Sequence, residues 1–187
     1  MIASQDRSQY FGASDTTMIC GNWETKTFIK WWLTKLGLNS SNLKTIAMQA
    51  GNNFEHDILN SLDVKGLEKD KQIIKDRLRV NLDCNTADCI YEVKTYNAEK
   101  QFKVSKQYWR QVQVEMYALG TEKAYIVAYG LEEKDYKNFF NKIDKTRIEY
   151  FPIEYDRDFI KNEYKPKLEI LTNYLKRGAM PCKLQEH

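Results

Sequence analysis

The most informative stretch of this chain is Arg79-Val-Asn-Leu-Asp83-Cys-Asn-Thr-Ala-Asp88-Cys-Ile-Tyr-Glu92-Val-Lys94-Thr95. It predicts two strands joined by a polar turn. Alternate side chains of a strand face the same side, so Glu92 and Lys94 point the same way on the second strand. The turn folds this strand back along the first, which brings Asp83 beside them. The stretch therefore predicts two carboxylates and one ammonium group at a single place on a sheet.

These three groups are typical of a site for a divalent cation. In proteins Mg²⁺ is commonly held by one or two carboxylates together with water and substrate phosphate. Asp83 and Glu92 are the expected ligands, and the main-chain carbonyl of Val93 is a further one. Lys94 is expected to orient an attacking water or to hold a phosphate oxygen. Asp88, nearer the turn, is an alternative to Asp83, and a solvated strand face is the ordinary explanation of an acid and a lysine two residues apart.

The whole chain, residues 1–187, is expected to form one domain with a substantial core, because 42% of its residues are hydrophobic. The net charge of +3 permits contact with a polyanion but does not require it. The four cysteines lack the paired spacing of zinc sites. No signal peptide and no apolar stretch of membrane-spanning length are recognised. We therefore expect a cytoplasmic protein with reduced thiols, in the host cytoplasm if the protein is viral.

Apolar spacing and capping residues predict helices at 14–20, 24–36, 40–62, 105–120 and 156–177. Ser40 and Ser41 are the expected caps of the third helix, and Gly51 either weakens it or marks close packing. Asp156 is the expected cap of the last helix, which Pro166 kinks or splits. Strands are predicted within 71–83 and at 88–95, 123–129 and 146–155. This order predicts an α/β or α+β sheet flanked by helices.

Other polar groups are candidates for the same site. Glu55, on the helix before the two strands, can complete a second metal position, although an exposed helix acid is the ordinary alternative. Gln111 shares a helix face with Tyr108 and can hydrogen-bond a water or a phosphate, or can be a surface amide. Ser14, at a helix N-terminus, and Arg7 are candidate phosphate-binding groups.

Contact with DNA is expected at a group of cations beside the helix of Gln111. Such contacts with backbone phosphates give sequence-independent, salt-dependent binding, although a solvated helix face is an equal alternative. The candidates are Lys100, Lys103, Lys106 and Arg110. Trp23, Trp31 and Trp32 can stack on bases, but we favour helix packing for them. His56 is not assigned as a ligand, because a lone histidine is more often a surface or packing residue.

Taken together, these segments resemble the PD-(D/E)XK nuclease superfamily, and most of all the branch of phage lambda exonuclease and the YqaJ-type viral recombination nucleases. The resemblance spans roughly residues 7 to 130 and consists of loose motifs in the family's order. They are Arg7…Gly12-Ala-Ser14, Gly51-Asn-Asn-Phe-Glu55, Asp83…Glu92-Val-Lys94 and Tyr108-Trp-Arg-Gln111-Val-Gln113, followed by Gly120 and the strand from Ala124 to Tyr129. It implies a restriction-endonuclease-like core: an α/β (α+β) fold with a central mixed sheet, a catalytic antiparallel hairpin and flanking helices.

The resemblance also implies an activity and a role for each matched residue. Asp83 and Glu92 would bind Mg²⁺, for which Mn²⁺ can substitute, and Glu55 would help a second ion. Lys94 would serve the nucleophilic water and Gln111 would support the site. Arg7 and Ser14 would hold a terminal 5′ phosphate. The implied function is a 5′-to-3′ double-strand DNA exonuclease in phage-type recombination. The implied partners are DNA, a single-strand annealing protein and further copies of the chain as a homo-oligomer, with no membrane involved.

The match departs from the family at three positions. Leu82 and Cys84 flank the catalytic Asp, where the family usually has proline and glycine, and Tyr96 replaces a frequent proline. Because the turn is atypical, Asp88 remains an alternative to Asp83 as the metal ligand. Two alternatives to the exonuclease remain, namely an endonuclease of the same superfamily and a non-catalytic DNA-binding domain. A phosphate pocket at Ser14 would favour action at DNA ends, and the intact acids and lysine argue for catalysis.

Overall fold

A five-stranded mixed sheet forms the centre of the protein, for which a computed structural model describes residues 8–39 and 45–181. The strands follow one another in the order β1-β2-β3-β4-β5. Neighbours pair antiparallel except β3 and β4, which run parallel. The predicted mixed sheet with an antiparallel pair at its centre is therefore confirmed. The strands are β1 (Glu68–Lys75), β2 (Leu78–Asn85), β3 (Cys89–Asn97), β4 (Lys123–Leu131) and β5 (Ile148–Glu154).

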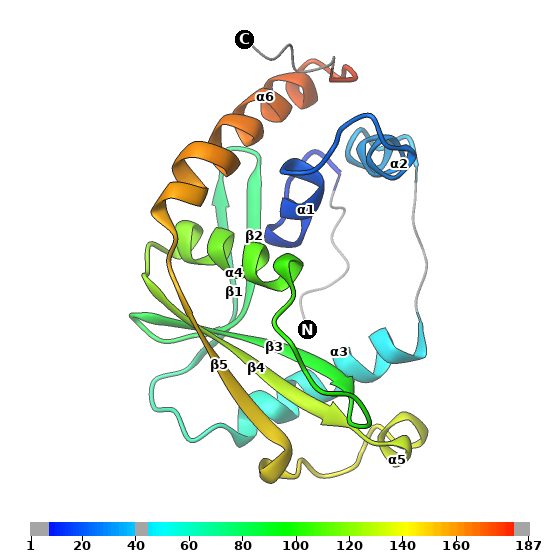
Figure 1. The fold of residues 1–187 in the computed structure, drawn as a ribbon, viewed down its shortest axis with the longest axis vertical. Coiled ribbons are helices and arrows are strands. Elements are labelled where there is room, and N and C mark those ends of the chain that lie inside the picture. Colours follow the sequence, from blue (N-terminus) through cyan, green and yellow to red (C-terminus); the bar gives the residue numbers. More distant parts are fainter. Residues whose placement is uncertain (1–7, 40–44, 182–187) are drawn as a thin grey trace.

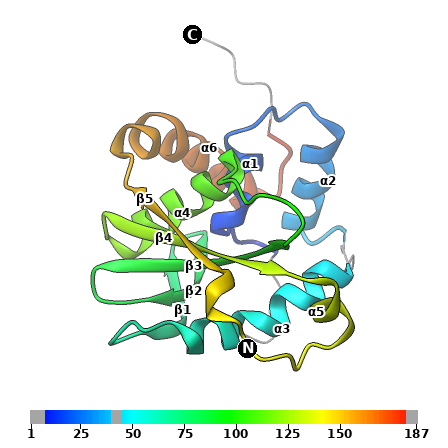
Figure 2. The ribbon, with the colours of Figure 1, turned by 60° about the horizontal axis from the view of Figure 1, so that its bottom comes forward.

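Helices cover both faces of the sheet (Figures 1 and 2). One apolar cluster joins the sheet to α1, α2, α4 and α6, and a second joins it to α3 on the other face. The short α5 lies on the α3 side. The α-helices are α1 (Thr16–Ile19), α2 (Lys26–Lys35), α3 (Ile46–Ser61), α4 (Lys106–Leu119), α5 (Glu133–Lys137) and α6 (Lys165–Lys176), and shorter helical segments are η1 (Ala13–Asp15), η2 (Lys145–Arg147) and the π-helical η3 (Phe159–Tyr164).

Strand alternation divides β3 between the two cores. Ile90 packs in the cluster on the α4 side, and Val93 packs in the cluster on the α3 side. Glu92 lies two residues after Ile90, so it faces α4 and is 2% exposed. The sequence thus places a charged residue at a core-facing position of a central strand. Such a position requires hydrogen-bonding partners, which α4 and Lys94 supply.

The ends of α4 are set by the residues that the sequence predicts. The Ser105 hydroxyl accepts a hydrogen bond from the main-chain N–H of Tyr108 at 3.2 Å, which satisfies one free donor of the first turn. Gly120 ends the helix with a positive φ of 83°, a conformation that glycine adopts without strain. These two ends define the orientation of the face that carries Gln111.

The helix α3 begins later than predicted within the described residues. Its cap is Thr45, whose hydroxyl accepts from Met48 N at 3.2 Å, and the predicted caps Ser40 and Ser41 lie outside the described residues. Gly51 marks close packing, because a Cβ there would lie 3.0 Å from Thr95 Oγ1. A side chain at this position would push α3 away from β3.

Pro166 was expected to kink or split the C-terminal helix, but the helical segment continues without a break and changes from the π-helical η3 to α6 at residue 165. The side chain of Asp156 accepts a hydrogen bond from Phe159 N at 2.8 Å, next to the start of this segment, as the predicted cap should. Pro166 lies in the first turn of α6. Two further details differ from the prediction: the short α5 was not expected, and β1 begins at Glu68 and not at residue 71.

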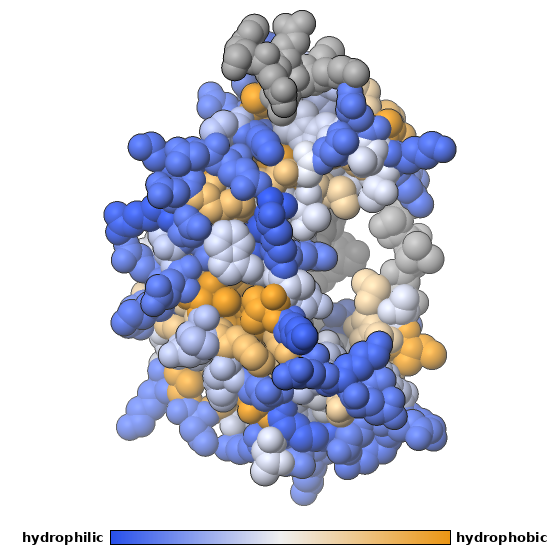
Figure 3. All heavy atoms as spheres, in the orientation of Figure 1, coloured by the Kyte–Doolittle hydropathy of each residue, from blue (hydrophilic) through white to orange (hydrophobic). Residues whose placement is uncertain are grey.

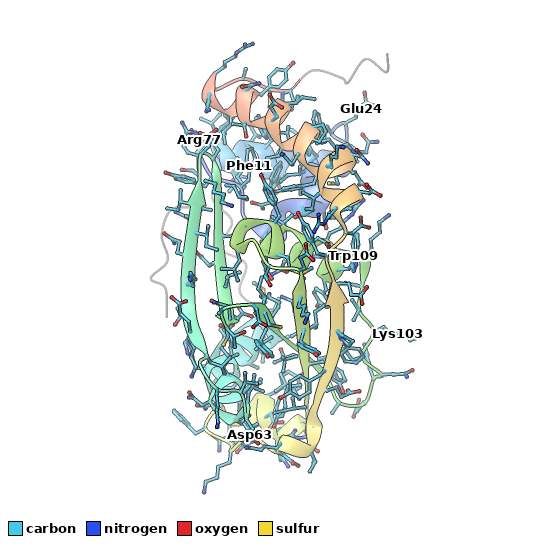
Figure 4. The ribbon with its side chains drawn as sticks, turned by 90° about the vertical axis from the view of Figure 1, so that its left-hand side faces the viewer. Phe11, Glu24, Asp63, Arg77, Lys103 and Trp109 are labelled. Atoms are coloured by element: carbon cyan, nitrogen blue, oxygen red, sulfur yellow. The ribbon has the colours of Figure 1, made fainter. Side chains whose placement is uncertain are left out.

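The surface is mainly hydrophilic, with apolar side chains gathered across the middle of one face, over the crossing of β4 and β5 (Figure 3). Lys103, in the segment before α4, extends away from the body of the protein (Figure 4). Within residues 8–39 and 45–181, no helix combines the length and the apolar character needed to cross a bilayer.

Candidate active site

The site begins where β2 and β3 separate. The two strands pair only at Cys84–Tyr91 and Asn85–Ile90. At the next position the carboxylate of Asp83 enters the gap, and its Oδ2 accepts a hydrogen bond from Val93 N at 2.9 Å. The Asp83 side chain thus takes the place of a main-chain hydrogen bond between the two strands. This hydrogen bond to β3 holds Asp83 beside Glu92. We call this separation of the strands the fork.

Glu92 is the acid of the predicted pair with the most side-chain partners. Its Oε1 accepts from Lys94 Nζ at 2.6 Å and from Gln111 Nε2 at 2.5 Å. Its Oε2 is buried and receives no hydrogen bond from any described residue. Because buried carboxylate oxygens normally have a partner, this atom is a suitable ligand for a cation. The chemistry of the residues therefore fits a divalent metal.

Lys94 is held as a cation at the edge of the site. Burial works against its charge, but the nearby carboxylates of Glu92 and Asp83 outweigh burial and raise the pKa of the lysine. The ammonium group also lies 5.1 Å from the centre of the Tyr108 ring. This contact between a cation and an aromatic face further favours the charged form. Lys94 therefore remains protonated at neutral pH.

Negative charge exceeds positive charge around Lys94. Burial, followed by repulsion from Glu92, raises the pKa of Asp83 and of Glu115 well above the usual range. The same two causes raise the pKa of Glu55 to about 7. We call Asp83, Glu92, Glu55 and Glu115 the acid cluster. A bound cation would relieve this repulsion and restore the charged form of each acid.

Glu55 reaches this cluster from α3, on the other face of the sheet. It is half-buried, and its pKa responds to Glu92, Asp70 and Lys94. Ligand atoms of Glu55, His56 and Asp70 also lie within 4.8 Å of one another, and His56 Nε2 is 3.7 Å from Asp70 Oδ2. His56 was not assigned a role from the sequence. Together with Asp70 and Glu55 it forms a second group of side chains that could hold a metal ion.

A cavity of about 180 Å³ connects the fork to the N-terminal segment. Its lining includes Asp83 and Arg79 from β2, Gln111 from α4, and Ser14 and Lys35 from η1 and α2. The structure therefore brings Ser14 into the neighbourhood of the predicted metal ligands. Arg7 lies outside the described residues.

The helical turn η1, which contains Ser14, is held in place by Asp15. This carboxylate accepts from Gly12 N at 2.7 Å and from Trp31 Nε1 at 2.8 Å, and it forms an ion pair with Lys35 Nζ at 2.6 Å. Lys35 is 5% exposed. The buried ion pair ties η1 to α2 and orders one wall of the cavity.

Larger hollows lie away from these groups. One of about 870 Å³ runs along Trp109 and Tyr155, and one of about 460 Å³ lies beside Tyr91 and Tyr125. Neither is lined by an acid of the acid cluster or by Lys94. We therefore locate the candidate site by the convergence of charged side chains and not by the size of the hollow.

Asp88 and Arg110, two site residues suggested by the sequence, do not belong to the group of side chains that meet at the fork. Asp88 is exposed at the turn, and its carboxylate accepts from Thr86 Oγ1 at 3.0 Å. Arg110 pairs with Glu163 at 2.5 Å and lies 5.8 Å from the Phe159 ring, so it joins α4 to η3. A contact between Arg110 and DNA would require this ion pair to open.

The remaining cations and the tryptophans divide clearly between surface and interior. Lys100, Lys103 and Lys106 are exposed and accessible to a polyanion. The helix-packing interpretation of the tryptophans is confirmed, because Trp32 is fully buried and the rings of Trp31 and Trp32 lie 5.9 Å apart. Trp23 stacks on Phe28 at 5.8 Å and donates to Ile19 O at 2.9 Å.

Three polar residues of this region were not predicted from the sequence. Arg79 shares the strand face of Asp83, at the spacing of alternate residues, and this signal was readable. Glu115 follows Gln111 by one helical turn, which was also readable. Lys35 carried no signal, because its position depends on how α2 packs against η1.

The fold and the arrangement of the site match the resemblance seen in the sequence. A mixed sheet with an acid at a strand fork, an acid and a lysine two residues apart, and a supporting helix is the pattern expected of a PD-(D/E)XK core. The sequence itself matches no protein-family model and no curated protein. Its likeness to known proteins is therefore visible only at the level of the fold.

Solved structures share this fold across most of their length. An alkaline exonuclease, LHK-Exo, from Laribacter hongkongensis has a TM-score of 0.65 and 19% identity, with 91% of this chain and 93% of that chain covered. The same enzyme in complex with dAMP has a TM-score of 0.66. A phage-related exonuclease from Haemophilus somnus 129PT has a TM-score of 0.65 and 18% identity, with 90% and 94% covered. These structures fit the lambda exonuclease and YqaJ-type branch that the sequence resembles, and the predicted fold is confirmed.

Proposed function

We propose that this protein is a divalent-metal-dependent deoxyribonuclease that acts at the ends of double-stranded DNA. The observation that carries the proposal is the convergence of Asp83, Glu92, Lys94 and Gln111 at the fork, with Glu92 Oε2 left as a buried acceptor. The fold is that of two exonucleases, one of which was solved with dAMP. A single domain spanning residues 1–187 would carry this activity.

The expected metal is Mg²⁺, with Mn²⁺ as a substitute. Asp83, Glu92 and the carbonyl of Val93 would hold it, and Glu55 would help to hold a second ion. When bound, the metal supplies an activated water and neutralises charge on the phosphate. Lys94 would orient that water or hold a phosphate oxygen, because its ammonium group is anchored at 2.6 Å to Glu92. Gln111, tied to the same Glu92 oxygen, would support the site.

Action at DNA ends is supported by the cavity beside the fork. Ser14, Lys35 and Arg79 line it, and it opens next to Asp83. A terminal 5′ phosphate bound there would place the first phosphodiester bond near the metal ligands. Arg7, expected in the same pocket, would add a further cation. Digestion would then proceed from the 5′ end of a strand toward its 3′ end.

Longer stretches of duplex would be bound by exposed cations near the start of α4. Lys103 and Lys106 are exposed there, and Lys103 extends outward (Figure 4). Tyr108, whose ring lies against Lys94, would border the path of the DNA. Such contacts recognise the backbone and not the sequence, as digestion from any end requires.

A role in phage-type recombination completes the proposal. Such a nuclease would release single strands to an annealing protein, and several copies of this chain would enclose the duplex as a homo-oligomer. An endonuclease of the same superfamily is the alternative, and a non-catalytic DNA-binding domain is the second. The acid cluster disfavours the non-catalytic alternative, because a domain that only binds DNA gains nothing from acids that repel phosphate.

The test uses linear and closed circular duplexes, both labelled, with purified protein and Mg²⁺. We expect digestion of linear DNA, none of closed circles, and none with a chelator. Lys94→Ala and Asp83→Ala should abolish cleavage. Cutting of closed circles would identify an endonuclease, and binding without cleavage would identify a non-catalytic domain.

The terminal pocket has its own test. Linear substrates that differ only in a 5′ phosphate or a 5′ hydroxyl are compared, with Ser14→Ala alongside the unaltered protein. We expect faster digestion of phosphorylated ends and a smaller difference for Ser14→Ala. Equal rates on both ends in the unaltered protein would remove the pocket from the proposal.

A further inference from the structure

Glu115 is a fully buried carboxylate to which the proposed reaction assigns no role. It lies on α4, one turn after Gln111, and is 0% exposed. Its Oε1 accepts from Gln111 Nε2 at 2.8 Å. A buried acid is costly unless it is hydrogen-bonded, so its presence beside the site requires an explanation.

The two hydrogen bonds of Gln111 determine how its carboxamide is turned. The same nitrogen donates to Glu92 Oε1 at 2.5 Å and to Glu115 Oε1 at 2.8 Å. An amide NH₂ group has two donors, and both are used by carboxylates. The amide oxygen could not replace the nitrogen, because it would face two acceptors. The oxygen of Gln111 must therefore point away from Glu92 and Glu115.

The open space beside this amide is the cavity at the fork. Gln111 lines that cavity together with Asp83 and Glu115. An amide oxygen directed there is an acceptor for a hydrogen-bond donor such as a water molecule or a hydrated cation. Glu92 alone would engage only one of the two N–H groups, and it is also bonded to Lys94 at 2.6 Å. Glu115 engages the other N–H group and leaves the amide one orientation.

We propose that Glu115 is a positioning residue that turns the carboxamide of Gln111 so that its oxygen accepts a hydrogen bond from water bound in the cavity. This inference rests on the proposed nuclease activity for its catalytic consequence, but the orientation of the amide does not. In this proposal Glu115 acts on the reaction through its hydrogen bond to Gln111.

The first experiment observes the amide directly, in the metal-free protein and without activity. The ¹⁵N–¹H₂ resonances of Gln111 are assigned by their loss in Gln111→Glu. We expect both protons to be shifted downfield and to exchange slowly with water, because each is bonded to a carboxylate. Glu115→Met should move one of them toward the position of a solvated amide. Unchanged Gln111 resonances in Glu115→Met would overturn the proposal.

The second experiment measures DNA cleavage with Mg²⁺ in three variants. Glu115→Met should lower kcat about 10-fold and leave KM for DNA unchanged. Glu115→Gln can still accept from Gln111 through its own amide oxygen, so it should restore most of the lost rate. If Glu115→Gln is as slow as Glu115→Met, charge and not the acceptor is required, and the proposal is wrong. Asp135→Asn, which alters a buried acid elsewhere, is the control for a general loss of stability.

The two experiments separate this inference from the proposed function. A protein that cleaves no DNA but shows the expected Gln111 resonances would refute the nuclease proposal and leave the orientation of the amide supported. If the unaltered protein cleaves DNA and Glu115→Met cleaves it at the same rate, only the inference is refuted.

Discussion

Two groups of buried charges in this protein differ in their balance of charge. The acid cluster surrounds a single lysine, Lys94, and the pKa values of Asp83 and Glu55 are raised. The second group, which we call the arginine cluster, consists of Arg147, Asp135 and Tyr129, with one carboxylate for one arginine. There burial works against the charge of Asp135, but hydrogen bonds from Arg147, Glu132 N and Asn141 outweigh it and lower the pKa.

The geometry of the arginine cluster explains this balance. Arg147 Nη1 donates to Asp135 Oδ2 at 2.7 Å and to Gly130 O at 3.0 Å, and Nη2 donates to the Tyr129 hydroxyl. Asp135 also accepts from Glu132 N at 3.0 Å. These bonds join β4, α5 and the segment that leads into β5. A cluster in which positive and negative charges balance stabilises the fold. In a cluster with an excess of negative charge, the acids repel one another, and a bound cation can relieve that repulsion. The excess of acid therefore distinguishes a site from a structural ion pair.

The largest expected effect follows from changing Asp83 to asparagine. Asp83→Asn keeps an oxygen that can accept from Val93 N, but it removes a charge from the acid cluster. We expect Mg²⁺-dependent cleavage to fall about 1000-fold, because a metal ligand and its charge are lost. The free energy of unfolding of the metal-free protein should rise, since repulsion within the cluster is reduced. Cleavage at the unaltered rate would show that the acid cluster is not the site.

An aspartate-to-asparagine change in the arginine cluster should instead lower stability and leave the rate of cleavage unchanged. Asp135→Asn leaves Arg147 buried without its carboxylate partner. We expect the free energy of unfolding, measured by urea denaturation, to fall by about 3 kcal/mol. The rate of cleavage per folded molecule should stay the same. A large loss of activity with unaltered stability would mean that the two clusters have been assigned the wrong roles.

The stability of the metal-free protein should depend on pH through the acid cluster. The pKa of Glu55 is raised from 4.5 to about 7, and the pKa values of Asp83 and Glu115 shift in the same direction. The folded protein thus binds protons more tightly than the unfolded chain. This stabilisation is complete below pH 4.5 and is lost as the pH rises through about 7.

Thermal denaturation provides the measurement. Between about pH 5 and pH 8 we expect Tm of the metal-free protein to fall by about 5 °C, and Mg²⁺ to recover most of this loss at the upper end of the range. In Glu55→Gln the pH dependence should be weaker. A Tm that rises steadily over this range in the metal-free protein would contradict the assigned pKa shifts.

Exposed lysines provide the smallest expected effect. Lys103→Gln with Lys106→Gln should reduce the slope of log binding constant against log salt by about 2, with a loss of affinity that is greatest at low salt and shrinks as salt is added. The control is a double change at Lys134 and Lys137, which are exposed on α5 and pair with Glu132 and Glu133. Equal effects of the two double changes would mean that the start of α4 does not face the DNA.

Much of this fold could be predicted because local signals agree with the final structure. Ser105 and Gly120 bound α4 as expected, and strand alternation correctly puts Glu92 and Lys94 on one face. The unexpected parts depend on tertiary contacts or on weak local signals. Thr45 caps α3 inside the range predicted to be helical already, and the five-residue α5 has no apolar period long enough to recognise.

The candidate site was predictable only in part. Asp83, Glu92 and Lys94 lie close in the sequence, so one hairpin is sufficient to bring them together. Whether Asp83 or Asp88 lies beside Glu92 could not be predicted from the sequence, because only the structure shows which carboxylate takes the place of a hydrogen bond between the strands. Lys35 reaches the cavity through the packing of α2 against η1, and no spacing in the sequence encodes that contact.

The fork also tells protein engineers where this chain tolerates change. The pairs Cys84–Tyr91 and Asn85–Ile90 stand between the functional groups and the connection at 86–88, and Ala87 is exposed. A fluorescent reporter or an affinity tag inserted after Ala87 would therefore leave the proposed metal ligands undisturbed. Deleting one of the paired residues 84, 85, 90 or 91 would instead shift Asp83 against Glu92 by one position and turn one of them to the opposite face. Natural variation in length should accordingly concentrate at 86–88 and avoid the paired residues.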